Sequence, residues 1–194
     1  MIQRIRPTQA YIDLNALEHN WNQILKVMGS DAMICPMVKA NAYGHGSEWI
    51  TSQLMKLGAQ QVGVSLVEEG LQLLQSGIDI EVLVFGYIKP EKLFIAFERG
   101  LTAVLYHMSQ LDFLRNSIFQ KTHSVHIKFN TGMNRLGFEP QDAEQVLSFF
   151  EENPHFHLKG IHSHLHSAET ADDPVGSSFQ QAKILQQIAH SFKH

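Results

Sequence analysis

Short apolar runs alternate with helical patterns along the whole chain, and this alternation limits the fold more than any other feature of the sequence. Runs typical of strands occur at residues 33–38, 61–65, 81–85, 101–106, 123–130 and 158–164. A segment with helical periodicity follows each run, and three of these helices are predicted to end at Gly58, Gly77 and Gly100. About six β-then-α units joined by short connections predict a parallel sheet with helical crossovers.

Two architectures fit this pattern. One is an open, doubly wound sheet, and the other is a (β/α)8 barrel, for which six units are two short. The residue pattern alone leaves both open. The chain shows no linker composition and no low-complexity tract that would divide it.

A helix is predicted to precede these units over residues 15–28. It would begin at Asn15, with Glu18 as a variant of the capping box, and Ser65 with Glu68 predicts the same device after residues 61–65. Pro36 is unfavourable inside the strand predicted over residues 33–38, since proline cannot donate to a sheet. Five apolar residues mark one face of the helix over residues 15–28: Leu17, Trp21, Ile24, Leu25 and Met28.

Composition narrows the class of protein. The chain has 194 residues and a formal net charge of −4, which argues against broad electrostatic capture of nucleic acid. Its one cysteine, Cys35, cannot form an internal disulfide and fits a reducing compartment. No apolar run approaches the roughly 18 residues of a membrane span, and the N-terminus lacks the apolar core of a signal peptide. We therefore expect a cytoplasmic protein without a nucleic-acid or membrane partner.

Polar side chains recur at the carboxyl ends of three predicted strands. Because alternate residues of a strand share a face, Lys39 belongs with the preceding Met33, Cys35 and Met37. Two further sets share a face in the same way, namely His126, Lys128 and Asn130, and His162, His164 and His166. Ligands bind at the carboxyl ends of the strands in both candidate architectures. These residues are therefore the candidates for function.

Lys39 is the sharpest of these candidates. The ordinary alternative is a lysine that leaves its strand and extends to solvent. Here small residues follow it, in "VKANAYGHG" (38–46). A lysine amine partly removed from water can attack a carbonyl and form a Schiff base, for which pyridoxal phosphate is the usual partner. Tyr43, Gly44 and Gly46 could then bind the phosphate.

"VKANAYGHG" resembles the cofactor-lysine motif of the alanine racemase family. Further segments along the chain are similar to the same family: "AYIDLNALEHN", "GVSLVEEGLQLLQSGI", "IKFNTGMNRLGF" and "GIHSHLHSAE". The resemblance covers essentially the whole chain. The lysine motif and "TGMNRLG" are specific, and the histidine segment is moderately so.

The resemblance implies a (β/α)8 barrel of the TIM type followed by a β-rich domain, assembled as a homodimer. Residues 1–194 would be the N-terminal part of the barrel and supply about six βα units, whereas the last barrel strands and the β-domain would lie outside this chain. The implied activity is an isomerase, a pyridoxal 5'-phosphate (PLP)-dependent alanine racemase. It would interconvert L-alanine and D-alanine by two-base proton exchange and supply D-alanine for peptidoglycan in the cell wall.

The resemblance also assigns roles to individual residues. Lys39 would hold the cofactor and act as the base for the α-proton of the D-enantiomer, and Tyr43 would hydrogen-bond the phosphate. Arg135 would hold the phenolic oxygen of the cofactor and the substrate carboxylate, a task that suits a planar guanidinium. His164 would lie beside the cofactor ring. In some members the lysine matching Lys128 is carbamylated and steadies the arginine.

The sequence departs from the family pattern at three places. The family's aspartate is Asn130 here, which removes a negative charge near Arg135 and predicts a changed activity rather than a lost one. His166 replaces a residue that is usually small, and the pattern assigns no role to it or to His162. The chain ends at His194, before the tyrosine of the partner subunit that serves as the opposing base in the family. We therefore expect residues 1–194 alone to be inactive.

Three alternatives stay open at this point. Alternate histidines at 162, 164 and 166 could bind zinc in a hydrolase, although no carboxylate or further histidine with ligand spacing supports a metal site. A non-catalytic PLP-binding barrel in cofactor homeostasis would suit the short chain, but it lacks "KANAYGHG" and "TGMNRLG". A serine racemase or a broad-specificity amino-acid racemase would share the motifs of this chain.

Overall fold

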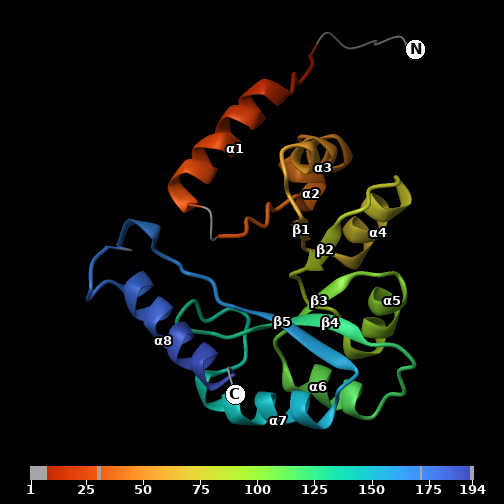
Figure 1. The fold of residues 1–194 in the computed structure, drawn as a ribbon, viewed down its shortest axis with the longest axis vertical. Coiled ribbons are helices and arrows are strands. Elements are labelled where there is room, and N and C mark those ends of the chain that lie inside the picture. Colours follow the sequence, from red (N-terminus) through yellow and green to blue (C-terminus); the bar gives the residue numbers. More distant parts are fainter. Residues whose placement is uncertain (1–7, 30–31, 171, 193–194) are drawn as a thin grey trace. The chain divides into compact units, whose positions relative to one another are not determined.

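A computed structural model describes residues 8–29, 32–170 and 172–192 of the chain (Figure 1). His194, at which the chain ends, lies outside the described residues. Two compact units divide the chain, Met1–Val82 and Leu83–His194, and each is described by itself.

The first unit begins with helix α1 (Leu14–Met28). Asp13 caps this helix, because its side chain accepts hydrogen bonds from the N–H groups of Asn15 and Ala16 at 2.8 and 3.2 Å. The prediction of Asn15 as the cap was therefore wrong by two residues. The predicted apolar face is also only partly buried: Trp21 is buried, whereas Ile24 and Met28 are about half exposed.

The rest of the first unit surrounds strand β1. Its elements are α2 (Lys39–Tyr43), α3 (Ser47–Lys56), β1 (Gln61–Val64) and α4 (Val67–Gln75). The predicted ends hold, since Gly58 and Gly77 follow α3 and α4 with positive φ of 99° and 82°. Glu69, not Glu68, completes the cap of α4, because its carboxylate accepts the N–H groups of Ser65 and Leu66.

The strand predicted over residues 33–38 is reduced to a single bridge. Met37 pairs in parallel with Gly63 of β1, the Val38 N–H donates to the Gly63 carbonyl, and the Gly63 N–H donates to the Pro36 carbonyl, both at 2.8 Å. Pro36 has no N–H of its own, so the ladder cannot extend back through it. The segment still occupies the place of a strand beside β1.

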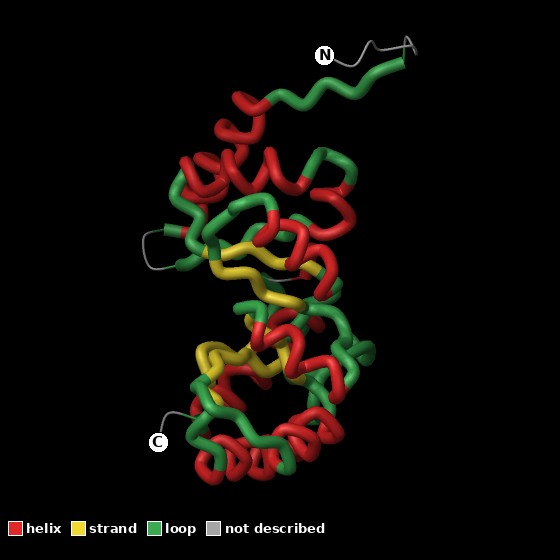
Figure 2. Tube along the Cα trace, turned by 90° about the vertical axis from the view of Figure 1, so that its right-hand side faces the viewer, coloured by secondary structure: helices red, strands yellow, loops and turns green. Residues whose placement is uncertain are grey.

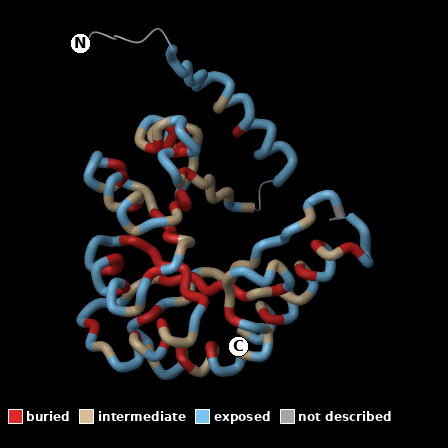
Figure 3. Tube along the Cα trace, turned by 180° about the vertical axis from the view of Figure 1, so that it is seen from behind, coloured by how far each residue is buried: buried red, intermediate tan, exposed pale blue. Residues whose placement is uncertain are grey.

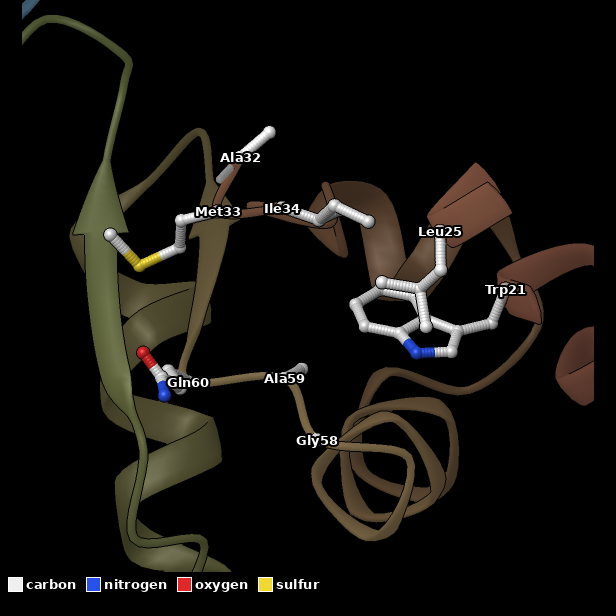
Figure 4. A pocket seen from close by; sticks show the side chains of 8 residues that line it. All are labelled: Trp21, Leu25, Ala32, Met33, Ile34, Gly58, Ala59 and Gln60. Carbon is white, nitrogen blue, oxygen red and sulfur yellow. The ribbon is translucent and has the colours of Figure 1, made fainter. Parts of the chain in front are cut away.

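A cavity of about 300 Å³ lies within the first unit (Figure 4). Its walls are formed by α1, by residues 32–34 and by residues 58–60, which lead into β1. It is lined by Trp21, Leu25, Ala32, Met33, Ile34, Gly58, Ala59 and Gln60. None of these side chains is titratable, so this cavity is not a candidate for general acid–base chemistry.

Strands and helices alternate along the second unit. Figure 2 shows the helices of the chain in red and its strands in yellow. Strand β2 (Glu81–Val84) crosses the boundary between the units, and it is followed by a 3-10 turn, η1 (Pro90–Lys92), and helix α5 (Leu93–Glu98). The remaining elements are β3 (Thr102–Leu105), α6 (Met108–Arg115), β4 (His123–Lys128), η2 (Pro140–Asp142), α7 (Ala143–Glu152), β5 (Phe156–His162), η3 (Ala168–Thr170) and α8 (Ser177–Ser191).

The strand order decides between the two architectures. Five strands form one parallel sheet in the order β1-β2-β3-β4-β5, so each strand neighbours the next in sequence. A doubly wound sheet reverses its order at a switch point, whereas a (β/α)8 barrel adds strands consecutively. With the Met37 bridge beside β1, the chain fills six successive positions of a barrel. The fold is α/β, and it is part of a TIM-type barrel.

Buried residues concentrate on the strands (Figure 3). In β3 both faces are buried, which fits its mostly apolar sequence, TAVL. The last four residues of β4 are buried as well, although its sequence alternates polar and apolar residues. An aromatic cluster fills the space between the helices and the amino ends of β4 and β5. Its members are Phe97, Phe119, His123, Phe149 and Phe156. Within the described residues, no helix is both long and apolar enough to cross a membrane.

Candidate functional site

Lys39 lies at the point where the chain leaves the sheet position beside β1. Val38 is buried and hydrogen-bonded to β1, and Lys39 follows it directly, half-buried at the start of α2. The predicted location of this lysine, at the carboxyl end of a strand position, is confirmed even though the strand itself is only a bridge.

The residues behind Lys39 form a left-handed turn. Four residues in succession, from Ala40 to Tyr43, have φ between 50° and 55°, and no glycine is among them. Left-handed backbone costs an L-residue roughly 1–2 kcal/mol, and it normally occurs at single positions. Gly44 and Gly46 continue with φ of 86° and 91°. Such strained backbone persists only where surrounding contacts fix it, and it clusters at functional sites.

Hydrogen bonds fix this turn from within. The Ala42 N–H donates to the Val38 carbonyl at 2.8 Å, and the Gly46 N–H donates to the Asn41 carbonyl at 2.9 Å. The Asn41 side chain also accepts the N–H of Ser47, the first residue of α3, at 2.8 Å. The turn is therefore tied at one end to the sheet position and at the other to a helix.

Tyr43 is brought close to Lys39 by the turn. The Nζ atom of Lys39 lies 5.8 Å from the centre of the Tyr43 ring, within the range of a cation–π contact. The Tyr43 side chain is 60% exposed. Its proposed phosphate contact stays a prediction.

The second unit holds the other candidate residues, on strands β4 and β5. Pairing of β4 with β5 sets Lys128 opposite His162 and His126 opposite Gly160, so these residues share one face of the sheet. His126 and Lys128 are buried, with exposures of 7% and 8%. The prediction that His126 and Lys128 face the same side is confirmed, whereas Asn130, predicted on the same strand face, lies beyond the end of β4.

His126 and His162 form a close pair. Nδ1 of His126 lies 2.6 Å from Nε2 of His162, and the rings stack with centres 4.8 Å apart. One nitrogen must donate and the other accept, so the pair is compatible with one proton between these two atoms. Gly160 makes room for the pair, because a Cβ there would lie 2.5 Å from Nδ1 of His126. The sequence pattern did not predict this role for Gly160.

Burial and neighbouring charge change the ionisation of this face. Burial lowers the pKa of His162 from 6.5 to about 4, with further lowering by His126 and Lys128. Burial also lowers the pKa of Lys128, and the positive charge of Arg135 lowers it further. On this face the pKa values of His162 and Lys128 are therefore both shifted in the direction that disfavours positive charge.

Arg135 lies in a loop that Asn130 organises. The Asn130 Oδ1 accepts the N–H groups of Gly132 and Asn134 at 3.2 and 2.9 Å, and its Nδ2 donates to Asn134 Oδ1 and to Glu139 Oε1 at 3.0 and 2.9 Å. An aspartate could make the first two bonds and not the last two. From the sequence, Asn130 was predicted only to remove a negative charge, and its structural role in this loop was not predicted.

Gly137 closes the base of the same loop. A Cβ at Gly137 would lie 2.3 Å from the Asn130 nitrogen, and its φ is 149°. The close approach lets Phe138 form hydrogen bonds with the backbone of Lys128 and Asn130, on either side of Phe129. These bonds close the segment from residue 128 to residue 138, and Arg135 lies within it. Arg135 itself is exposed.

His164 and His166 do not lie on the strand. Strand β5 ends at His162, so the prediction that His162, His164 and His166 share one strand face was wrong. The backbone after His162 instead forms hydrogen bonds with the buried side chain of Gln181 on α8. Gln181 Nε2 donates to the His164 carbonyl at 3.0 Å, and Gln181 Oε1 accepts the His166 N–H at 3.1 Å. Both histidines are exposed, and His166 Nδ1 lies 2.6 Å from Ser167 Oγ.

Among the residues that the structure describes, no group of three or more histidine, cysteine, aspartate or glutamate side chains could hold a metal ion. The zinc alternative therefore has no support from the geometry. Cys35 is no better a candidate as a nucleophile, because burial and Glu81 raise its pKa to about 11.

Comparison with known proteins identifies the family. The family model described as alanine racemase, N-terminal domain, matches residues 12–194. This chain belongs to the alanine racemase family. It is 38% identical over 173 residues to an alanine racemase of Geobacter sulfurreducens, covering 87% of this chain and 44% of that protein. It is 32% identical over 174 residues to an alanine racemase of Desulfovibrio desulfuricans, covering 89% and 47%.

Solved structures give the same result. An alanine racemase of Clostridium difficile superposes with a TM-score of 0.86 at 27% identity, over 97% of this chain and 50% of that one. An alanine racemase of Corynebacterium glutamicum does so with a TM-score of 0.79 at 30% identity, over 94% and 52%. The chain spans about half the length of the relatives that it matches.

Proposed function

We propose that the whole protein to which these residues belong is a PLP-dependent alanine racemase that interconverts L-alanine and D-alanine. The observation that carries the proposal is the half-buried amine of Lys39 on a fixed left-handed turn, in a chain whose relatives are alanine racemases. Strain of this kind is maintained where the position of a side chain matters.

The residues of the turn fit the chemistry of the cofactor. Covalent attachment needs a primary amine, and within the described part of the chain Lys39 takes part in no ion pair. Phosphate binding needs donors and space. The phenol of Tyr43 is exposed, and a Cβ at Gly44 would meet nothing within 4 Å, so the backbone there is open.

PLP, when bound, supplies an electron sink that stabilises negative charge on the substrate α-carbon. The proposal gives Lys39 the tasks of holding the cofactor and moving the α-proton of the D-enantiomer at its Nζ. Tyr43 would donate a hydrogen bond to the phosphate, and His164 would lie against the ring. Arg135 would bind the substrate carboxylate and the phenolic oxygen through its planar fork of donors.

Lys128 would act through Arg135. Its buried amine has a lowered pKa, which favours the neutral form, and a neutral amine is the form that adds carbon dioxide to become a carbamate. The negative charge of a carbamate would pair with a guanidinium. We therefore include carbamylation of Lys128 in the proposal, as a means of steadying Arg135.

The remaining parts of the proposal rest on the family. The opposing base would be a tyrosine from the C-terminal domain of a partner subunit, in a cytoplasmic homodimer, and D-alanine would serve peptidoglycan synthesis. Residues 1–194 contain one of the two bases, so we propose that they do not racemise alanine alone.

Covalent trapping tests the proposal directly. Borohydride reduction of the full-length protein with PLP should fix the cofactor to Lys39, as located by peptide mass, and L-alanine should be converted to D-alanine. Reduced cofactor on another lysine, or no fixation at all, would refute the assignment of Lys39. Serine offered in place of alanine separates a specific enzyme from a broad one.

A further inference from the structure

The carboxylate of Glu69 contacts two segments of the chain, the residues just before α4 and the turn that follows Lys39. Its Oε2 accepts the N–H groups of Ser65 and Leu66 at 2.9 and 3.1 Å. Its Oε1 accepts the N–H of Ala40 at 2.7 Å, from a segment 29 residues earlier in the sequence. All four residues lie in the first unit of the chain, where α2 and α4 are labelled in Figure 1.

Helix capping accounts for only one of the two oxygens. A glutamate at this position of a capping box uses its carboxylate on the N–H groups just before its own helix. The bond to Ala40 adds nothing to that cap. It is also the shortest of the three, at 2.7 Å against 2.9 and 3.1 Å, which is within the range of a charge-assisted hydrogen bond.

Ala40 is the residue at which the strained turn begins. It follows Lys39 directly and has φ of 50°. On the other side of Lys39, the Val38 N–H is bonded to Gly63 of β1. The backbone of Lys39 is thus fixed by β1 through Val38 and by α4 through Ala40, and Glu69 supplies the second attachment.

We infer that Glu69 is a positioning residue for Lys39. Its carboxylate holds the first left-handed residue of the turn in place, so that the Lys39 amine is presented in one orientation to the aldehyde of the cofactor. This inference rests on the proposed function, because it concerns how Lys39 reaches that ligand. Glu69 touches neither the cofactor nor the substrate in this account.

The chain provides a matched control in Glu68. Glu68 is the neighbouring residue on the same helix, and it is exposed. Within the described residues its side chain makes no hydrogen bond or ion pair. Glu68→Gln removes the same charge from the same turn of α4 without touching Ala40.

Glu69→Gln removes one of the two acceptor oxygens that bond Ala40 on one side and Ser65 and Leu66 on the other. The amide keeps one acceptor oxygen and turns an NH2 group toward the other set of N–H donors. Glu69→Asp keeps both oxygens but shortens the reach by one methylene, so it serves as a second variant with charge retained. Both are made in the full-length protein, beside wild type and Glu68→Gln.

Two measurements separate positioning from folding. Amide hydrogen exchange of the cofactor-free protein should be at least about tenfold faster at Ala40 in Glu69→Gln, with α1 and β1 unchanged. Covalent capture of PLP by Lys39, followed by visible absorption and fixed with borohydride, should be at least about tenfold slower in Glu69→Gln and partly restored in Glu69→Asp. Glu68→Gln should match wild type in both.

The outcomes are distinguishable. Wild-type exchange at Ala40 and wild-type capture rates in Glu69→Gln overturn the inference, while Lys39 keeps its proposed role. Faster exchange at Ala40 with an unchanged capture rate also overturns it, because Glu69 would then stabilise the turn without positioning the amine. Failure of wild-type Lys39 to capture PLP overturns the proposed function together with the inference.

Discussion

Two lysines stand at the carboxyl ends of sheet positions, and they are held in opposite ways. Lys39 follows a segment too irregular to count as a strand, is half-buried, and precedes a left-handed turn. Lys128 is the last residue of a complete strand, is 8% exposed, and has a pKa lowered by burial and by Arg135. A strained backbone turn follows the first amine, whereas burial lowers the pKa of the second.

If the proposed function holds, the difference teaches how one residue type can serve two tasks in one fold. An amine that must meet a ligand needs an accessible, fixed position, which a strained turn provides. An amine that acts on a neighbouring side chain can be enclosed, and the enclosure lowers its pKa. An asparagine two residues after each lysine accepts backbone hydrogen bonds from the segment that follows. Asn41 accepts the N–H of the first residue of α3, and Asn130 accepts two N–H groups in the loop of Arg135.

The largest expected effect separates the two lysines. Lys39→Ala in the full-length protein should abolish borohydride fixation of PLP and lower racemisation by at least about 10³-fold, equivalent to roughly 4 kcal/mol. Lys128→Met should still fix the cofactor at Lys39, because its amine is enclosed. Peptide mass after reduction and chiral assay of alanine check both. Fixation on Lys128 in the wild type would reverse the comparison.

The buried face of Lys128 should make the protein sensitive to acid. With a folded pKa of about 4 against 6.5, His162 stays neutral in the folded state while the unfolded chain takes up a proton. Stability should therefore fall as pH decreases from 6.5 to about 4, by an amount on the order of 2 kcal/mol once partial exposure is allowed for. The charged or titratable groups facing His162 are His126 and Lys128.

His162→Phe tests this prediction. Phenylalanine keeps a ring beside Phe85, whose centre lies 5.5 Å from that of His162, and removes the titration. Thermal unfolding measured from pH 7 to pH 4 should show a smaller loss in the variant than in wild type. His157→Gln, at an exposed position of the same strand, is the control and should follow wild type. An equal loss in His162→Phe would show that another group senses the acid.

Arg135 tests whether the loop behind Lys128 serves the ligand. Arg135→Lys keeps the charge but loses the planar fork, so turnover in the full-length protein should fall about tenfold, or about 1.4 kcal/mol. Arg115→Lys is the control, because Arg115 contacts Asp112 and Glu152 at the surface. Wild-type kinetics in Arg135→Lys would leave the loop without its proposed role.

The sequence predicted what local patterns encode. Alternating apolar runs located the strand positions, glycines marked the ends of α3, α4 and α5, and the motif placed Lys39 at the edge of the sheet. Strand order was not predictable from the pattern, because periodicity describes each strand and says nothing of its neighbour. The family resemblance and the order of the strands agree on the barrel.

Apart from the cap of α1, which is a local error of two residues, the errors of prediction have a common cause. The run from Ala40 to Tyr43 lacks any glycine that would announce a positive φ, so its left-handed turn is invisible to propensity. Glu69 and Gln181 act through bonds to segments distant in sequence, and Gly160 makes room for a ring on another strand. His164 and His166 kept the alternation of a strand beyond the point where β5 ends. Tertiary contacts decided each of these positions.

The smallest expected effect concerns the asparagine behind Lys128. Asn130→Asp restores the family's aspartate but loses the two bonds that Nδ2 donates, and it sets a carboxylate where the amide now faces Glu139. The variant should be less stable by about 1 kcal/mol, because two exposed hydrogen bonds are lost and two like charges meet. Glu139→Gln in the same chain should recover most of the loss, since its amide can donate to Asp at position 130.

A double-mutant cycle of denaturant unfolding measures the coupling of the two positions. Additive effects of the two substitutions would show that the loop of Arg135 does not depend on the contact between Asn130 and Glu139, and the parallel with Asn41 would then fail.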